Sequence, residues 1–273
     1  MANLRAIRLR IKSVESTRQI TKSMKMVAAA KLRKTQQAFG RLRDFAEKSE
    51  TMLADLGCGG ENPYLRPHEK NDRICYVLIV GNRGLCGTYN HSLLRFLEQL
   101  RAAEERETLL YTVGRWGKDL IGPTDGHFEI SDTPTAEEAK TVTEALKALY
   151  RSGEADEIVL VYQRFKSVLQ QTPETKTLLP LRLPEGGEAR DVIYEPDAET
   201  VLERLTELYL ETTVRSTLLE ARTGEHASRM TAMTAAADNT EELIGELTLE
   251  LNHARQAAIT TEISEIVGGA AAL

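Results

Sequence analysis

The residues that could do chemistry are few, and the most suggestive of them form a glycine-rich segment. Gly81-Asn82-Arg83-Gly84-Leu85-Cys86-Gly87 follows an apolar run and precedes an amphipathic one, which is where a phosphate-binding loop would lie. It does not match G-x-G-x-x-G, and no G-x-x-x-x-G-K-[ST] occurs in the chain. We therefore favour a tight strand-to-helix turn that needs glycine over nucleotide binding.

Cysteine, histidine and acidic residues do not assemble a catalytic pattern either. Cys86 has only His91 close to it in sequence, so a plain thiol is favoured over a nucleophile. The three cysteines are odd in number and lack zinc spacing, which favours a reducing compartment. The other histidines are scattered, and paired acids such as Glu104-Glu105 fall on expected helix faces. We expect no active site, no cofactor and no metal.

The segments around this loop predict a small α/β domain. Continuous apolar runs at 74–80 and 157–162, with a further strand at 108–113, are typical of buried strands, and amphipathic helices are expected at 90–105 and 134–151. Weaker alternation over 165–183 predicts edge strands. Alternating strands and helices indicate a right-handed, mainly parallel, Rossmann-like sheet.

Both ends of the chain show a different period, with apolar or small residues recurring every three or four positions. Such a sustained heptad stripe predicts a coiled-coil seam. The first helix would end at Leu56, before glycines that can stop it, and would span about 84 Å; the last would run from Asp197 to Gly268, roughly 108 Å. The seam residues are Leu4, Ile7, Ile11, Val14, Ala28, Leu32, Phe39, Leu42, Ala46, Leu53 and Leu56, then Leu202, Leu205, Tyr209, Leu219, Met230, Met233, Ala237, Ile244, Leu247, Leu251, Ala254 and Ala258.

Charge indicates that these two helices pair with each other. Residues 1–43 carry twelve bases and one acid, a net charge of +11, whereas residues 195–273 carry fifteen acids and five arginines, a net charge of −10. Opposite charge favours pairing within the chain, although two unrelated solvated faces would look the same. The predicted organisation is a coiled-coil helix over 1–57, an inserted α/β domain over 73–190 and a second coiled-coil helix over 196–273.

Overall charge and hydropathy limit the kinds of partner that the chain can have and its relation to a membrane. The net charge of −6 argues against nucleic acid as a partner. Bases at positions 5, 8, 10 and 12 interrupt any leader-like apolar run, and the 74–80 run is too short to span a bilayer. We expect a soluble chain that could still lie against a membrane complex.

Several motifs follow one another along the whole chain: Ile20 to Arg33 (ITKSMKMVAAAKLR), Gly84 to Asn90 (GLCGTYN), Arg229 to Met233 (RMTAM) with Asp238-Asn239, and Ala254 to Ala270 (ARQAAITTEISEIVGGA). Together, and in this order, they resemble the gamma subunit family of F-type ATP synthases. The resemblance is densest at the two ends.

This resemblance implies a non-catalytic rotor shaft that couples proton-driven rotation of the membrane c-ring to ATP synthesis. The implied partners are the alpha and beta subunits of the catalytic head, the epsilon subunit and the c-ring, without nucleic acid. The implied location is the cytoplasmic face of a bacterial membrane, as a peripheral protein. Residues implied to touch the catalytic subunits are Met24, Lys25, Cys86, Arg229, Arg255, Gln256, Thr260 and Glu262, and residues implied to touch the c-ring or epsilon are Tyr194 and Glu195.

Two of these implied contacts can also be interpreted from the residue pattern itself. Extending the heptad places Arg18, Thr21 and Lys25 on the seam and turns Met24 and Val27 outward, as a sliding surface would need, unless the coil simply stutters there. Before the last helix, Pro196 can open that helix, and Glu195, Asp197 and Glu199 favour its positive end. The alternative, which the resemblance implies, is that Glu195 grips the ring.

Three rival interpretations remain open at this stage. The first is a nucleotide-binding oxidoreductase-like domain with coiled-coil arms. The second is a nucleic-acid adaptor, which the acidic last helix disfavours because it would repel phosphate. The third is a redox-switched plastid shaft, which the lack of a cysteine pair between Asp119 and Glu157 disfavours.

Overall fold

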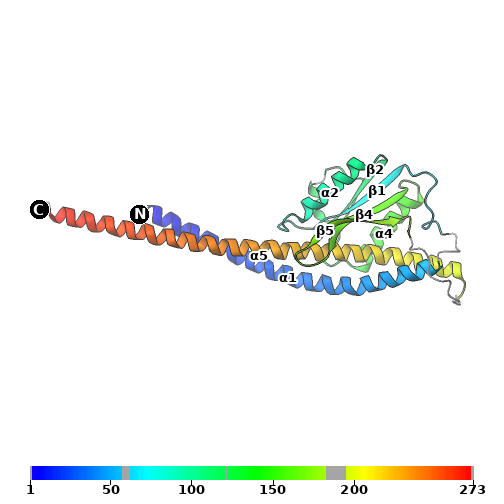
Figure 1. Ribbon diagram of the computed structural model, residues 1–273, viewed down its shortest axis with the longest axis horizontal. Coiled ribbons are helices and arrows are strands. Elements are labelled where there is room, and N and C mark those ends of the chain that lie inside the picture. Colours follow the sequence, from blue (N-terminus) through cyan, green and yellow to red (C-terminus); the bar gives the residue numbers. More distant parts are fainter. Residues whose placement is uncertain (1, 57–61, 121, 183–194, 272–273) are drawn as a thin grey trace. The chain divides into compact units, whose positions relative to one another are not determined.

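The computed structural model describes residues 2–56, 62–120, 122–182 and 195–271. Two compact units can be separated: residues 1–27 with 230–273, and residues 28–229. The predicted domain limits at 57 and 190 lie outside the described residues. Along the chain the elements are α1 (Ala2–Leu56), β1 (Arg73–Ile79), α2 (Tyr89–Ala103), β2 (Glu107–Val113), α3 (Arg115–Leu120), β3 (Gly126–Phe128), α4 (Ala136–Arg151), β4 (Glu157–Phe165), β5 (Gln171–Leu179) and α5 (Ala198–Ala271) (Figure 1).

The larger unit contains a five-stranded sheet in the order β3-β2-β1-β4-β5. The first four strands are parallel, with Tyr76 of β1 opposite Leu110 of β2 and Val159 of β4, and only β5 runs antiparallel to its neighbour β4. The mostly parallel α/β sheet predicted from the apolar runs is therefore confirmed. We name residues 73–182 the sheet domain.

Both faces of this sheet are covered, which explains why β1 is apolar at nearly every position. On one face Leu93 and Leu97 of α2 pack against Tyr76 and Leu78. On the other face α4 and α5 pack against Val77 and Ile79, through residues such as Leu146 and Leu210. The central strands have no solvated side and need no alternating pattern.

Two short elements were not predicted, and one was predicted too loosely. Helix α3 and strand β3 are six and three residues long, too short to show a period. The weak alternation over 165–183 resolves into one antiparallel edge strand, β5, while β4 continues to Phe165. Helix α4 begins after Thr135, whose side chain and that of Glu138 form a capping box, so Pro134 precedes the cap.

Within the larger unit, α1 and α5 bury the predicted seam. Ala28, Leu32 and Phe39 are buried on α1, and Leu202 and Tyr209 are buried on α5. Leu53 of α1 belongs to the same apolar cluster as Tyr209 and Leu210 of α5. The residues of the long heptad stripe therefore form the contact between the paired helices, as the sequence predicts.

In the smaller unit the two helices lie side by side and antiparallel, with both chain ends at one side (Figure 1). Ile7 is buried on α1, and Met233 and Leu247 are buried on α5. Arg18 and Lys22 approach Glu241 at 3.6 and 3.8 Å, so the predicted attraction between opposite charges is present. These exposed pairs contribute little stability and act mainly on partner choice.

The predicted polar interruption of the seam is also present in the smaller unit. Thr21 is 8 % exposed and donates its hydroxyl to the backbone oxygen of Arg18, while Lys25 is half-buried. Val27 points outward and is 55 % exposed. Met24, which we expected to point outward, is half-buried, and Met26 is the exposed methionine instead. A helix turns 100° per residue, so Met24 and Met26, which are two residues apart, point about 200° away from each other and cannot share one exposed face.

Candidate functional site

The glycine-rich segment forms the turn between β1 and α2, and α5 holds it in place. The Gly81 amide donates to Asn90 Oδ1 at 2.9 Å, and Ser228 of α5 donates its hydroxyl to the backbone oxygen of Cys86 at 2.7 Å. A Cβ on Gly81 would meet the Glu225 carboxyl at 3.0 Å, so glycine is needed for close approach of α5. Leu85, at the tip, has a φ of 60° and is 63 % exposed.

Helix α5 presents a buried ionic cluster to this turn. Glu225 accepts from Arg222 Nη1 and from Arg229 Nη2, both at 2.6 Å, and both Arg222 and Glu225 are 1 % exposed. Burial alone would raise the pKa of Glu225, but the two arginines outweigh it and hold that pKa below its usual value. Spacings of three and four residues place all three side chains on one helix face.

The arginines of this cluster reach the carboxyl ends of the strands. Arg222 donates to the Val80 backbone oxygen at 3.2 Å and to Asn82 Oδ1 at 2.8 Å. Arg229 donates to the Arg83 and Gly84 backbone oxygens at 3.0 and 3.3 Å. Doubly wound sheets bind their ligands beyond these strand ends. Here side chains of the chain's own α5 occupy that place, which argues against the oxidoreductase-like alternative.

His226 extends the cluster without adding a charge. It is 1 % exposed, and burial, reinforced by Arg229, lowers its pKa, so that its ring is neutral at pH 7. Its Nδ1 lies 3.3 Å from Arg229 Nη1 and its Nε2 lies 3.4 Å from the Asp132 backbone oxygen. A neutral ring satisfies both contacts by accepting at Nδ1 and donating from Nε2.

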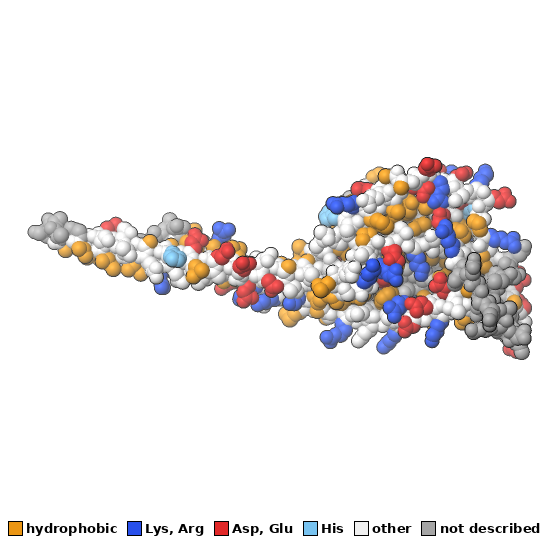
Figure 2. All heavy atoms as spheres, viewed as in Figure 1, with side chains coloured by type: hydrophobic (Ala, Val, Ile, Leu, Met, Phe, Trp, Pro, Cys, Tyr) orange, Lys and Arg blue, Asp and Glu red, His pale blue; other side chains and the backbone are white. Residues whose placement is uncertain are grey.

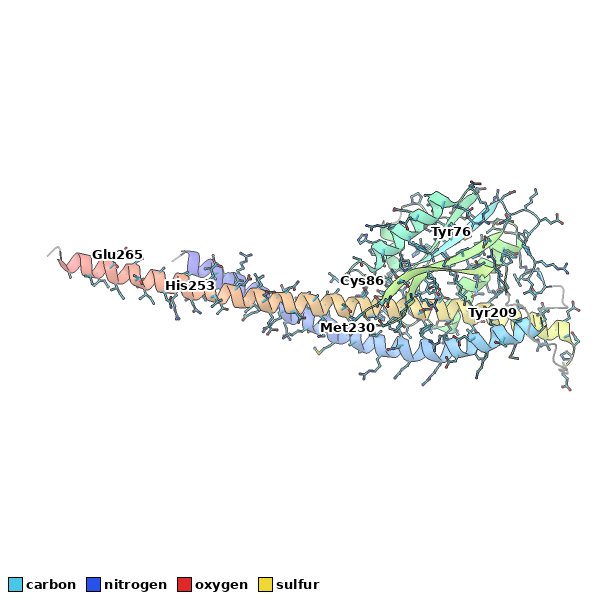
Figure 3. The ribbon with its side chains drawn as sticks, in the orientation of Figure 1. Tyr76, Cys86, Tyr209, Met230, His253 and Glu265 are labelled. Carbon is cyan, nitrogen blue, oxygen red and sulfur yellow. The ribbon has the colours of Figure 1, made fainter. Side chains whose placement is uncertain are left out.

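Cys86 is a structural thiol, as the sequence suggests. It is 3 % exposed and lies 3.6 Å from both Asn90 Nδ2 and the Arg83 backbone oxygen, beside α5 (Figure 3). Burial raises its pKa, which disfavours the thiolate that a nucleophile requires. His91 packs edge-on against Trp116 instead, with ring centroids 5.5 Å apart. No cluster of metal-binding side chains occurs among the residues that the structure describes.

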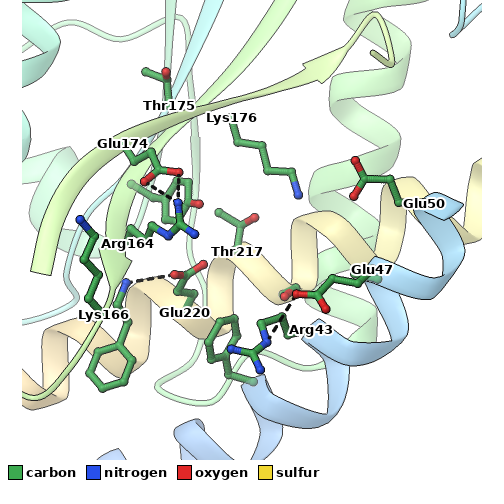
Figure 4. A pocket seen from close by; sticks show the side chains of 15 residues that line it. Arg43, Glu47, Glu50, Arg164, Lys166, Glu174, Thr175, Lys176, Thr217 and Glu220 are labelled. Atoms are coloured by element: carbon green, nitrogen blue, oxygen red, sulfur yellow. Dashed lines mark hydrogen bonds and ion pairs between the residues drawn. The ribbon is translucent and has the colours of Figure 1, made fainter. Parts of the chain in front are cut away.

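A separate crevice of about 590 Å³ lies in the larger unit between α1, the β4–β5 hairpin and α5 (Figure 4). Lysines 166 and 176 and Arg164 line the hairpin side, and Glu47 and Glu50 line the α1 side. Glu220 of α5 accepts from the Phe165 amide at 3.0 Å. Burial raises the pKa of Glu220 to about 7, against the opposing effects of that hydrogen bond and of Arg164.

The other implied contact residues fall into separate groups. Arg255, Gln256, Thr260 and Glu262 are exposed on α5, whereas Arg229 is 7 % exposed and serves the cluster described above. Near the start of α5, Glu195 is exposed and Tyr194 lies outside the described residues. Of the acids expected to favour the start of this helix, Asp197 caps it by accepting from the Thr200 amide at 2.8 Å.

The smaller unit exposes apolar side chains where α5 continues past the start of α1 (Figure 1). Ile259, Ile263, Ile266 and Val267 are between 48 and 71 % exposed, and orange side chains line this end of the chain in Figure 2. No helix in the described ranges is long and apolar enough to cross a membrane. Such a run of exposed apolar side chains is typical of an interaction surface.

Comparison with known proteins agrees with these features. The family described as ATP synthase matches residues 3–273. The chain is 44 % identical to the ATP synthase gamma chain of Desulfitobacterium hafniense and 42 % identical to that of Moorella thermoacetica, over the full length of each pair. Its fold is similar to a chain in the OSCP/F1/c-ring structure of the Euglena gracilis mitochondrial ATP synthase, with a TM-score of 0.75, 22 % identity and coverage of 99 % and 94 %.

A second solved structure has the same fold. It is a chain of the central stalk and c-ring of the Tetrahymena thermophila mitochondrial ATP synthase, with a TM-score of 0.60, 23 % identity and coverage of 80 % of this chain and 99 % of that one. Identity above 40 % over the whole length, together with the family match, decides the assignment. The chain belongs to the ATP synthase gamma-chain family and is a non-catalytic rotor subunit of the F-type enzyme.

Proposed function

We propose that this chain is the shaft that couples rotation of a membrane c-ring to conformational change in the alpha and beta subunits of the catalytic head. The observation that carries the proposal is the exposed end of α5, whose apolar side chains Ile259, Ile263, Ile266 and Val267 are not covered by any other helix among the described residues. A surface of this kind needs a surrounding partner to be stable in water. The two solved structures with this fold, one of OSCP, F1 and c-ring and one of central stalk and c-ring, support the same arrangement.

The head contact is assigned to two faces of the smaller unit. One consists of Gln256, Thr260 and Glu262 with Arg255, all exposed near the end of α5. The other consists of Met24 and Lys25 on α1, to which the exposed Met26 and Val27 are added. Exposed apolar groups beside bases suit a surface that slides past acidic, partly apolar loops, because methionine adapts to different packings.

The glycine-rich turn is assigned as a third contact with the head, but through residues other than Cys86 and Arg229, which the resemblance implies. Cys86 and Arg229 are buried, so their part is to hold the turn in shape. The exposed residues of the turn are Arg83, Gly84, Leu85 and Gly87. Leu85 has a positive φ, a conformation that costs free energy for a residue with a Cβ and is common at functional sites.

The contact with the c-ring and the epsilon subunit is assigned to Tyr194 and Glu195. Glu195 is exposed just before α5, and Asp197 already caps the helix. The Glu195 carboxylate is therefore available to pair with a base on the ring. This assignment places the chain at the cytoplasmic face of a bacterial membrane, as a peripheral subunit.

The test is ATP-driven proton pumping by the whole complex in vesicles. Gln256→Ala with Thr260→Ala removes polar contacts from the α5 face, and Glu250→Ala, an exposed change on the same helix, is the matched control. We expect the double variant to assemble and to pump less per ATP hydrolysed, with the control unchanged. Normal pumping by the double variant would remove the α5 face from the assignment, and a complex that excludes the unaltered chain would refute the shaft.

A further inference from the structure

A chain of polar contacts in the larger unit joins the sheet domain to both long helices. At its centre is Asn82, in the turn after β1. Its Nδ2 donates to the Ile130 backbone oxygen at 2.8 Å and lies 3.4 Å from Asp132 Oδ1. Its Oδ1 accepts from Arg222 of α5 at 2.8 Å and from the Arg115 amide at 3.3 Å. One amide thus fixes the ends of three strands relative to α5.

Asp132 carries the connection onward to α1. Its other carboxylate oxygen, Oδ2, accepts from Lys31 Nζ at 2.5 Å, and the two side chains are 28 % and 35 % exposed. Burial by itself would raise the pKa of Asp132, but Lys31 and Asn82 lower it to about 2, so the carboxylate is ionised at neutral pH. The pair is partly shielded from water, which strengthens it relative to a fully exposed ion pair.

This arrangement is costly for a contact that serves stability alone. Arg222 is almost completely buried, and its Nε has no hydrogen-bond partner among the described residues. Buried ion pairs are often no better for stability than apolar residues of similar size. The apolar face of α5 already packs on the sheet through Leu210, Val214 and Leu218. A role other than stability is therefore needed to account for the polar chain.

Apolar contacts hold surfaces together but are not directional, whereas hydrogen bonds fix orientation. We propose that Lys31, Asp132 and Asn82 form a clamp that fastens the sheet domain to α1 and, through Arg222, to α5, so that torque on the domain reaches both long helices. This inference rests on the proposed shaft function. Lys31, Asp132 and Asn82 are then positioning residues, which transmit torque from the sheet domain to the helices. Without the clamp, α1 would keep apolar contacts with the domain, such as those of Leu53, but these contacts are not directional.

The experiment uses the whole complex in vesicles and measures protons pumped per ATP hydrolysed as an opposing proton gradient is raised. Asp132→Asn keeps the shape of the side chain and removes its charge, and Lys31→Met removes the partner charge. The swapped pair Lys31→Asp with Asp132→Lys restores opposite charges. Glu129→Gln is the control, because the Arg115–Glu129 pair is exposed in the same domain and touches neither long helix.

We expect both single variants to assemble and to hydrolyse ATP normally in the detached head. Against a high gradient their pumping ratio should fall by about threefold or more, the swapped pair should regain most of it, and the control should not change. A second readout is angular stiffness: with the head fixed, a bead on the sheet domain should fluctuate over a wider angle in Asp132→Asn.

Several results would overturn the clamp. They are an unchanged ratio in both single variants, a loss that the swapped pair does not regain, or failure of both single variants to assemble, which would give the pair a role in folding. A failure of the proposed shaft function can be distinguished from a failure of the clamp, because the complex with the unaltered chain would then pump no protons.

Discussion

Replacing Glu220 by glutamine should stabilise the chain at alkaline pH and leave it nearly unchanged at acidic pH. Glu220 lies on α5 in the crevice of Figure 4, where burial raises its pKa from 4.5 to about 7. Between these values the folded chain holds a proton that the unfolded chain has released. Stability therefore falls as the pH rises through this window and levels off above the folded pKa.

The magnitude follows from the two pKa values. At 1.36 kcal/mol for each tenfold change, ionised Glu220 costs the fold roughly 3 kcal/mol at pH 8 relative to pH 4, as an upper bound. The charged groups that face it act in both directions. The bases lower this cost, namely Arg43 of α1, Arg164 of β4, Lys166 just after β4 and Lys176 of β5, whereas the carboxylates of Glu47 and Glu50 on α1 and of Glu174 on β5 raise it. Glutamine keeps an oxygen that can accept from the Phe165 amide, so the hydrogen bond survives the change.

The assay is urea unfolding at low temperature and low protein concentration, which limit melting and aggregation of the isolated chain. It is followed by the fluorescence of Trp116, the single tryptophan, at several pH values. Trp116 packs against the apolar cluster under α2 and reports on the larger unit. The control is Glu47→Gln, a change in an exposed residue of the same crevice. We expect Glu220→Gln to gain about 1–3 kcal/mol at pH 8 and little at pH 5. An equal gain at both pH values, or a gain in the control as large as in Glu220→Gln, would refute the reasoning.

Three further predictions concern other parts of the chain. Expressed alone, the chain should aggregate or melt at low temperature, because Leu249, Ile263 and Ile266 are exposed; a stable monomer in light scattering and calorimetry would count against the shaft. Asp197→Ala should lower the denaturant midpoint of unfolding through loss of the α5 cap, and Asp197→Asn should lower it much less. Glu195→Lys should uncouple pumping while ATP hydrolysis by the detached head continues, and Glu195→Gln should do so weakly; unchanged coupling in the lysine variant would eliminate the grip on the ring.

Local periodicity accounts for what the sequence predicted well. Burial of β1 on both faces requires an unbroken apolar run, and helix pairing requires apolar residues every three or four positions. Both patterns are visible without knowledge of the partner, as Ile74–Val80 and the seam residues show. The polar interruption at Thr21 and Lys25 was predictable for the same reason, because heptad spacing continues through it.

Local periodicity could not predict the short strand β3 or the direction of the edge strand β5. Strand β3 has three residues and forms only because β2 offers it a pairing edge. Its Gly126 lies against the Tyr111 ring, where a Cβ would come within 2.2 Å. The direction of β5 likewise depends on its hairpin with β4 and not on its own composition.

The roles of the polar residues were decided by tertiary structure alone. The spacing of three and four residues between Arg222, Glu225 and Arg229 is typical of salt bridges on a solvated helix face. From the sequence alone, this pattern predicts exposed side chains. Docking of the turn at Gly81 onto this face buries the cluster, and Cys86 with it. The sequence by itself determined which helices pair and which strands are central, because those properties repeat along the chain. Which charges are buried, and what they hold, depends on residues about 140 positions away that only the fold brings within hydrogen-bond distance.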